Sequence, residues 1–575
     1  MAQKYFSGRY FLILIVTLFT LGNSWAVDCP NISLNTPLEI GLNENELSLL
    51  CPKVDGKRQS IPHYQAKFYL RGFLQSRGHL APSFNANGPT LEVTSHKKSY
   101  LKKVDVKSEE LKSEILRFYA EKIVTPPLLD SIEEFISEYY REEGHPCPKI
   151  STSYSPQESS LSIEVNNLER KNFGAIKYEK IKDLNPNFIK RFEAFKETQL
   201  YNPNKIELSK KRALRSNVVQ STYYQKNCGN NQEEFNIKQS FVPGPPRTLR
   251  FGIGANTEVG PMVRLKWANH RFGDMASTLE AKLQASFKEQ SFSVGADFFL
   301  WEDSPRRSWK SEFQNTRTSE SDFEEITSKV SQKIKWTHDT TNEHWIWQTG
   351  PAIVANWFET DSDKSRRSLV NPSWQASLQA QSHNYELYDL FPQQGHMLKL
   401  STDLRPTWLN NKFDIYQFSF RSVKLIPMMK WGRGNLVAGF RGNFESTWVE
   451  DSVDISSLPP GLRYYGGGEN SNRGRRLNSL PKNNGLGALS HALVRAEIRR
   501  TYAFVPELEI LLFSDFSMFS ERAWRVEETI WASPGLGVRW LSPIGPVQAY
   551  AAKSLKYRPN EDDGFHFYIG LGGEL

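Results

Sequence analysis

The residues best suited to chemistry in this chain are four cysteines, Cys29, Cys51, Cys147 and Cys228, all in its first half. Thiolates bind metals or form disulfides, and metal sites usually present them as C-x-x-C or together with histidines. No C-x-x-C occurs, and the only nearby histidine is His145. We therefore expect disulfides and no metal. Four thiols allow three pairings, of which sequence proximity favours Cys29 with Cys51 and Cys147 with Cys228.

No motif of a catalytic class stands out. The sequence contains no G-x-S-x-G, P-loop or H-E-x-x-H pattern. Glycines cluster at residues 466–468 and 570–573 without forming a G-x-G-x-x-G fingerprint, and in strands or loops such glycines allow a bend or close backbone approach. We expect a protein that is not an enzyme and holds no cofactor. A Ser/His/Asp site scattered along the sequence stays open.

The amino terminus indicates the compartment. Lys4 and Arg9 precede the apolar run from Phe11 to Leu21, which is too short to cross a bilayer as a helix, and small residues up to Ala26 fit a cleavage site. Residues 1–26 are expected to be a secretory signal peptide. In an exported protein, the net charge of +8 favours anionic outer-membrane lipid over nucleic acid as the counterpart.

The elements that position the rest of the chain are strands. At the carboxyl terminus Phe565, Phe567, Ile569 and Leu571 alternate with polar or small residues, as lipid-facing and lumen-facing side chains do in a membrane barrel. Similar alternating segments recur after residue 247, separated by polar loops. At about twenty residues per strand and turn, residues 247–575 predict a transmembrane antiparallel β-barrel of about sixteen strands.

The preceding residues predict three small α+β modules, because helix, glycine stop and strand recur at intervals of roughly seventy residues. We expect them at residues 27–103, 104–170 and 171–246. They resemble polypeptide-transport-associated (POTRA) domains, which offer free sheet edges to extended clients. Asp130 and Glu133 suggest a capping box at the start of the second module's helix.

The joint between the two halves is "FVPGPPRT", from Phe241 to Thr248. Its three prolines cannot donate ladder hydrogen bonds, so a stiff linker is expected here.

Four stretches carry a family resemblance. "GIGANTEVGP" is similar to a first hairpin, "LPPGLRYYGGGENSNRGRRLNSL" to a long sixth loop, "GLGVRWLSPIGPVQ" to a Trp-x-Ser-Pro-x-Gly-Pro element, and "FYIGLGGEL" to a characteristic ending. Together they resemble the outer-membrane assembly factors of the BamA superfamily, and within it the TamA family of translocation and assembly module barrels. Three modules before the barrel fit TamA better than the five usual in BamA or the two usual in two-partner secretion transporters.

The resemblance implies a lock in the lumen, where an arginine of loop six pairs with an acid of the barrel wall. By position these residues are Arg473, followed by Gly474, and Asp515. The sequence departs from the pattern at Asn472 and Arg475, where an aliphatic and an aromatic residue are usual, and Ser517 replaces a glycine. These departures put the local packing of loop six in doubt.

The seam between the first and last strands suggests a mechanism. Gly252 and Gly254 of the first strand are expected to face glycines of the last strand, because the two strands must pair to close the sheet. Each glycine weakens a strand by roughly 0.5–1 kcal/mol relative to alanine, so the seam could part and template client strands. The residues assigned to this seam are Gly252, Ile253, Gly254, Ile569, Gly570, Gly572 and Gly573.

The implied function is assembly or translocation of outer-membrane proteins, particularly autotransporters, in the outer membrane of a Gram-negative bacterium. The implied partner is a TamB-like protein anchored in the inner membrane, and the modules would lie in the periplasm. Two alternatives stay open. One is a two-partner secretion pore that exports an unfolded client through its lumen, and the other is a barrel enzyme such as an outer-membrane phospholipase.

Overall fold

The structure is a computed structural model, and it describes most of the chain after the first 28 residues. The expected signal peptide, Cys228 and Gly573 lie outside the described residues. Within the described part, no helix is long and apolar enough to cross a membrane. The described residues are 29–34, 42–178, 184–226, 234–301, 304, 306–360, 363–385, 392–432, 434–481, 483, 485–501, 507–527, 529–542, 545–555 and 564–572.

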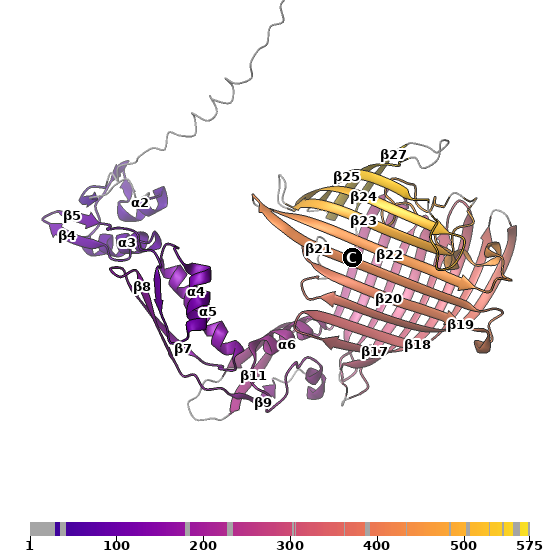
Figure 1. Ribbon diagram of the computed structural model, residues 1–575, viewed down its shortest axis with the longest axis horizontal. Helices are drawn as coiled ribbons and strands as arrows, with labels where there is room; N and C mark the ends of the chain where they lie inside the picture. The colour runs from indigo at the N-terminus through magenta and orange to yellow at the C-terminus, as the bar shows by residue number, and fades with distance from the viewer. Residues whose placement is uncertain are drawn as a thin grey trace, which may run out of the picture. The chain divides into compact units, whose positions relative to one another are not determined.

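The chain forms two compact units. One contains the first two amino-terminal modules and parts of the third, and the other contains the rest of the third module and a closed barrel. Figure 1 shows the modules in indigo to magenta and the barrel in pink to yellow.

Each module begins with a strand, continues through two helical segments and ends with two strands, and in the first module a short two-stranded hairpin lies between the helices. In the first module, β5 lies between β1 and β4, and β1 runs parallel to β5. Helix α3 packs Ala66, Leu70 and Leu74 into the core at the spacing that the sequence predicts. A disulfide joins Cys29 to Cys51 in the same core. Its elements are β1 (Ile32–Leu34), α2 (Glu44–Leu50), β2 (Lys53–Val54), β3 (Lys57–Arg58), α3 (His63–Ser76), β4 (Ser83–Asn87) and β5 (Thr90–Thr94).

The second module repeats this order, with β6 parallel to β8 and β7 on its other side. The predicted capping box at Asp130 and Glu133 is wrong. Helix α5 begins earlier, where the Thr125 side chain accepts from the Leu128 N–H and Pro126 occupies the first turn, a position suited to its fixed φ. Cys147 is disulfide-bonded as well. The elements are β6 (Lys103–Asp105), α4 (Glu109–Tyr119), α5 (Pro126–Glu142), β7 (Lys149–Ser155) and β8 (Ser160–Asn166).

The third module has the sheet order β10-β11-β9. Its last strand continues through Pro243, which pairs with Val219, and the first barrel strand starts at Arg247. The stiff linker is therefore shorter than predicted, because a proline at a strand end removes no hydrogen bond that the sheet needs. The elements are β9 (Asn172–Tyr178), η1 (Pro186–Arg191), α6 (Pro203–Arg215), β10 (Val219–Lys226) and β11 (Glu234–Pro243).

Salt bridges and hydrogen bonds join the third module to barrel turns within the same unit. Arg212 of α6 donates from Nε to the buried carboxylate of Asp339 at 2.8 Å. Arg191 donates to the carbonyls of Met275 and Ala276, both at 3.1 Å. These contacts mark the rim at which the chain enters the barrel, called the entry rim below.

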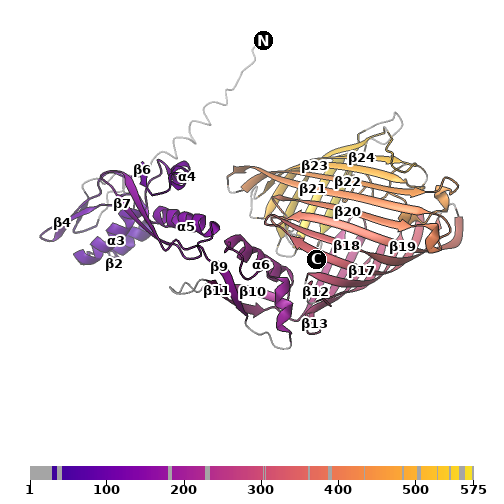
Figure 2. The same cartoon turned by 60° about the horizontal axis from the view of Figure 1, so that its bottom comes forward.

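The barrel has sixteen antiparallel strands in sequence order, closed by pairing of the first with the last, which confirms the predicted fold class. Figure 2 shows the strands tilted around the lumen. The strands are β12 (Arg247–Asn256), β13 (Gly260–Phe272), β14 (Ser277–Ser286), β15 (Glu289–Phe298), β16 (Arg307–Ser319), β17 (Phe323–Asp339), β18 (Glu343–Thr360), β19 (Asp363–Ser382), β20 (Gly395–Arg405), β21 (Ile415–Trp431), β22 (Gly434–Val449), β23 (Ser490–Thr501), β24 (Leu508–Ser520), β25 (Trp531–Ser542), β26 (Gly545–Lys553) and β27 (Phe565–Leu571).

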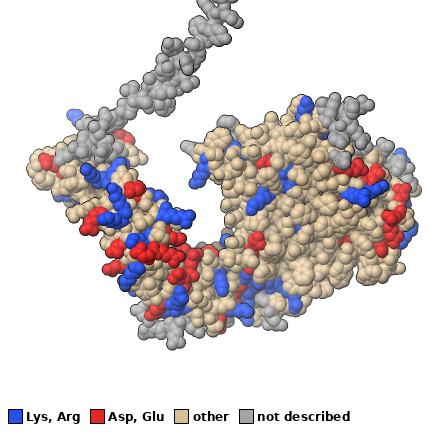
Figure 3. Space-filling view, viewed as in Figure 1, with Lys and Arg blue, Asp and Glu red and all other residues tan. Residues whose placement is uncertain are grey.

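The outer wall carries the apolar side chains that the alternation predicts. On β27 Phe565, Phe567, Ile569 and Leu571 are exposed to the outside, whereas Tyr568 and Gly570 are buried inside. On the face drawn in Figure 3, much of the barrel wall is neither acidic nor basic. A wall of this kind fits a bilayer, because the strands satisfy each other's backbone groups where no water is present.

Candidate functional site

The candidate site lies inside the barrel, where loop six (residues 450–489, between β22 and β23) meets the wall and the seam. Loop six is hydrogen-bonded to the wall at several points. The Gly461 N–H donates to Glu325 of β17 at 2.6 Å, and the Tyr464 hydroxyl accepts from Thr447 of β22 at 3.1 Å. These contacts hold loop six against the inner wall on both sides of the lumen.

The guanidinium of Arg473 is enclosed in this wall, with 1% of the residue exposed. Its Nε and Nη2 atoms donate to the two carboxylate oxygens of Asp515 on β24, at 2.8 and 2.6 Å. The backbone N–H of Arg473 donates to the same carboxylate at 3.0 Å. This two-pronged geometry fixes the direction of the loop as well as compensating the charge. The structure thus brings the two residues of the expected lock together.

A second acid, Glu497 of β23, completes the lock. It accepts from Arg473 Nη1 at 2.9 Å and lies 3.5 Å from Arg539 Nη2. The Arg473 guanidinium carbon also lies 3.4 Å from the ring centre of Phe513. Sequence reasoning missed Glu497. The signal was present in the alternation Arg495, Glu497, Arg499, which places three charged side chains on one face of a barrel strand. Charged side chains need either water or partners of opposite charge, so this face had to line a hydrated or ion-paired lumen.

The residues around Arg473 explain the departures from the family pattern. Asn472 is fully buried, donates to the Trp531 carbonyl at 2.7 Å and accepts from the Ser533 hydroxyl. At Gly474 a Cβ atom would lie 2.3 Å from Ser533 Oγ, so only glycine lets the loop approach β25. Arg475 lies over the Trp531 ring at 5.0 Å. Asn472 and Arg475 therefore have partners of their own, the Ser517 hydroxyl is buried without a hydrogen-bond partner among the described residues, and the lock keeps its geometry.

The seam between β12 and β27 differs from every other strand pair in the barrel. Within the described residues only Ala255 with Leu571 and Asn256 with Gly570 are in register. The neighbouring pair, β26 with β27, is in register at seven positions, from Val547 with Leu571 to Lys553 with Phe565. One further link follows β12, where the Thr257 N–H donates to the Ile569 carbonyl at 3.1 Å.

The cause of this weak pairing is an offset along the barrel axis. The carboxyl-terminal end of β12, which lies away from the entry rim, pairs with the carboxyl-terminal end of β27, which points toward the entry rim. Phe565 and Phe567, at the other end of β27, therefore lie beyond the turn that follows β12. Toward the entry rim, Leu249 and Phe251 have no β27 partner among the described residues. As predicted, Gly254 faces the last strand, at Leu571 and Gly572, whereas the position that the register sets opposite Gly252 lies outside the described residues. Within the described residues the offset limits the pairing, and the flexibility of the seam glycines stays a prediction.

Gly254 and Gly572 lie where the backbones of the two strands approach most closely. A Cβ atom on Gly254 would lie 2.7 Å from the carbonyl oxygens of Leu571 and Gly572. Gly572 itself has a φ of +72° and approaches the Ile253 carbonyl. Ile253 and Ile569 point outward and are not opposite each other, because Ile569 faces Thr257. The seam is thus a short backbone-to-backbone contact with apolar side chains outside it.

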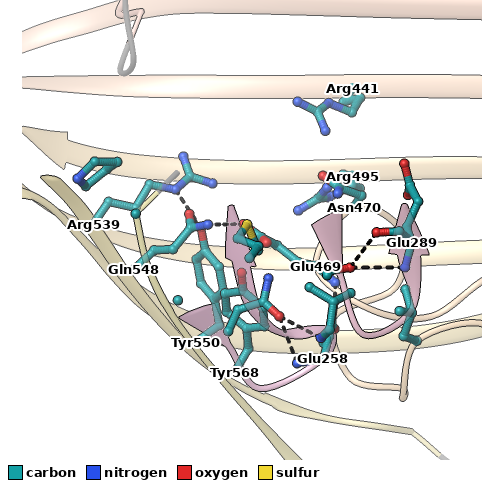
Figure 4. Close-up of a pocket in the computed structure, with 18 of the residues that line it drawn as sticks. Glu258, Glu289, Arg441, Glu469, Asn470, Arg495, Arg539, Gln548, Tyr550 and Tyr568 are labelled. Carbon is teal, nitrogen blue, oxygen red and sulfur yellow. Dashed lines mark hydrogen bonds between the residues drawn. The ribbon is translucent and has the colours of Figure 1, made fainter. Parts of the chain in front are cut away.

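A cavity of about 550 Å³ lies in the lumen between loop six, the seam and the arginine-bearing wall. Arg441 and Glu258 lie on opposite sides of it (Figure 4). Its lining also includes Glu469 of loop six and Gln548 of β26. Among the described residues, no group of three or more His, Cys, Asp or Glu is placed to hold a metal ion.

Fold and site define the class of protein: a closed sixteen-stranded barrel whose lumen holds an anchored loop, preceded by small α+β modules. Residues 229–574 match the Omp85 superfamily domain, and the chain belongs to this superfamily. The POTRA-like modules and the barrel together match its architecture. Membership implies an outer-membrane protein with periplasmic amino-terminal domains.

Solved structures agree on the fold. BamA from Haemophilus ducreyi lacking POTRA domains 1–3 is similar with a TM-score of 0.58 and 15% identity, over 83% of this chain and 99% of that one. CdiB from Acinetobacter baumannii has a TM-score of 0.50 and 12% identity, over 83% and 90%. CdiB from Escherichia coli has a TM-score of 0.51 and 11% identity, over 82% and 90%. At these identities the likeness concerns the fold alone.

Proposed function

We propose that this protein is an outer-membrane assembly and translocation factor that inserts or secretes autotransporter-type outer-membrane proteins through the seam between β12 and β27. The observation that carries the proposal is the register of this seam, which pairs at two positions within the described residues. A barrel that served only as a pore would gain stability from a fully paired seam, because backbone groups facing lipid are costly to leave unpaired.

The seam has the chemistry of a strand template. Backbone N–H and C=O groups along an unpaired edge bind an extended client strand by β-augmentation. The side chains beside this edge, Leu249, Phe251 and Ile253, are exposed and apolar, so a growing client sheet would stay in contact with lipid. The described residues of the seam form two registered pairs, so few of their hydrogen bonds separate when it opens.

Within the superfamily we propose a TamA-like role. Three amino-terminal modules and the ending "FYIGLGGEL" support it. A TamB-like, inner-membrane-anchored protein is then the proposed partner, and the modules would receive clients in the periplasm of a Gram-negative bacterium. We propose no enzymatic activity, because no motif of a catalytic class stands out in the sequence.

The second candidate is a two-partner secretion pore, which the similarity to the CdiB structures keeps in view. The two functions use different routes, since one opens the wall and the other the lumen. The anchoring of loop six by Arg473, with Asp515 and Glu497 around it, favours the wall. A large single-channel conductance after deletion of loop six, with client export kept, would favour the pore.

A disulfide across the seam tests the proposal. Ala255 and Leu571 are directly opposite and both lie on the outer face, so Ala255→Cys with Leu571→Cys can be oxidised to staple the two strands. The matched control is Ala549→Cys with Ile569→Cys, which staples the already paired strands β26 and β27. We expect the oxidised seam staple to stop assembly of an autotransporter barrel in liposomes, and reduction to restore it. Assembly at the control's rate by the oxidised seam staple would contradict the proposal.

A further inference from the structure

The tip of loop six touches both sides of the seam. The Glu469 N–H donates to the carboxylate of Glu258 at 2.9 Å, and the Glu469 side chain accepts from Gln548 Nε2. Glu258 belongs to the turn after β12, and Gln548 to β26, which pairs with β27. We call Glu258, Glu469 and Gln548 the clasp. Figure 4 shows the three side chains together at the edge of the cavity.

The clasp is rigid at its loop end. Gly468 packs so closely on Glu258 that a Cβ atom would lie 2.9 Å from its carboxylate oxygen. Four residues after Glu469, the chain is fixed by the lock at Arg473. On the strand side, the neighbouring Thr257 carries the last backbone link to β27, at Ile569. A movement that separates β12 from β27 must therefore also pull Glu258 away from loop six.

We propose that the clasp holds the seam closed and that its release, governed by the protonation of Glu258, is a condition for opening. This inference rests on the proposed function, because it assumes that the seam opens. It assigns Glu258 and Glu469 a positioning role that differs from the lock at Arg473, since the clasp joins loop six to the turn after β12 and to β26, the neighbour of β27, and the lock joins loop six to β23 and β24.

Several charged groups surround Glu258. Glu469 reaches it from loop six, and Glu320 and Lys288 approach from the neighbouring turns, where they form an ion pair at 2.6 Å. Tyr568 of β27 also faces it. Glu320 is held by Lys288 and accepts from Asn478 of loop six at 2.9 Å. Lys288 is thus shared between Glu320 and Glu258. The negative charge of Glu258 beside Glu469 is therefore only partly compensated.

Burial, and after it the negative charge of Glu469, raise the pKa of Glu258 to about 7. In an open seam this carboxylate would regain water and an ordinary pKa near 4.5. The closed state thus binds the proton more tightly, so its added stability is complete below the open-state pKa and is lost as pH rises through about 7. From pH 6 to pH 8 the ratio of closed to open seam should fall about tenfold.

Distances between spin labels on Phe251→Cys and Phe567→Cys, on the outer faces of β12 and β27, report the seam in the full-length protein in nanodiscs. A label pair on Leu283 and Phe292, opposite each other on β14 and β15, is the control for the closed wall. We expect the wild type to gain a longer-distance population between pH 6 and pH 8 at the seam and none at the control pair. Heat-modifiable electrophoretic mobility verifies that each barrel is folded.

Three variants separate the parts of the clasp. Glu469→Ala should open the seam at both pH values, because the link to Gln548 is lost. Glu258→Gln should keep it closed at both, because the amide still accepts from the Glu469 N–H and cannot ionise. Glu289→Gln, in the same cavity, should behave as wild type. A wild-type distance distribution in Glu469→Ala, or a wild-type pH response in Glu258→Gln, would overturn the inference.

The same variants in a client-assembly assay separate this inference from the proposed function. If Glu469→Ala shifts the distances while assembly is unchanged, the clasp stands and the function through the seam fails. If the distances do not move, the clasp fails whatever the assembly rate.

Discussion

The seam and the far wall of the barrel are built from the same kind of strand and have opposite properties. Strands β18 and β19 contain 18 and 20 residues and pair from Glu343 with Ser382 to Thr360 with Asp363. Strands β12 and β27 contain 10 and 7 residues and meet at two positions within the described residues. A closed sheet can therefore concentrate its weakness at one place by strand length and offset, while every other pair of neighbouring strands is in register at seven or more positions within the described residues.

The largest effect should come from removing the lock that fastens loop six to the wall. Arg473→Ala removes the two-pronged partner of Asp515 and the nearest cation of Glu497, which costs about 3–5 kcal/mol. Denaturant unfolding of the barrel in detergent measures this loss. Arg441→Ala is the matched control, since this cavity arginine makes no ion pair with any described residue, and it should change stability little. Equal losses in both variants would show that the lock adds nothing specific.

A smaller effect should appear in hydrogen exchange. In residues 249–253, alternate backbone N–H groups point toward the β27 side, where the described residues provide no partner, whereas β18 is paired on both sides. We expect these amides to exchange at least about tenfold faster than those of β18, because each missing hydrogen bond is worth about 0.5–1.5 kcal/mol. Equal protection of the two strands would remove the contrast between seam and far wall.

A third effect should come from single methyl groups. Gly254→Ala forces a Cβ against two carbonyl oxygens at the seam, and overpacking of this kind costs about 1–3 kcal/mol. In the wall, Gly295→Ala meets nothing nearer than 3.7 Å and should stabilise by about 0.5–1 kcal/mol. Thermal unfolding and the spin-label distances at the seam measure both variants. Destabilisation by Gly295→Ala as large as that by Gly254→Ala would show that a glycine is no more necessary at the seam than in the wall.

Much of the fold could be read from the residues. The alternation of Phe565, Phe567 and Ile569 with Tyr568 and Gly570 predicts which side chains face out, because a strand has a period of two. The offset of the seam could not be predicted this way. Register at a closure depends on the tilt and stagger of all sixteen strands together, and no local pattern encodes it.

The site was predicted in part for a similar reason. Arg473 and Asp515 are 42 positions apart and come together through the path of loop six, which the family resemblance supplied. Glu497, Glu258 and Gln548 belong to three other elements, and their convergence follows from the barrel's curvature. The charge alternation on β23 marks Glu497, but the residue types of Glu258 and Gln548 gave no sign of it, since polar residues in a barrel strand or turn are most often solvated.

The enclosure of Arg473 has a consequence for how this protein is made. Its guanidinium reaches its two acids from inside a cylinder and is 1% exposed once there. Moving such a charged group out of water is costly unless its replacement partners are already aligned. We therefore expect loop six to enter the lumen while β23 and β24 are forming and before β27 docks. The burial of this one side chain would then determine the order of these steps in biogenesis. A pulse-chase experiment that follows protease protection of the loop and of the last strand would reveal this order.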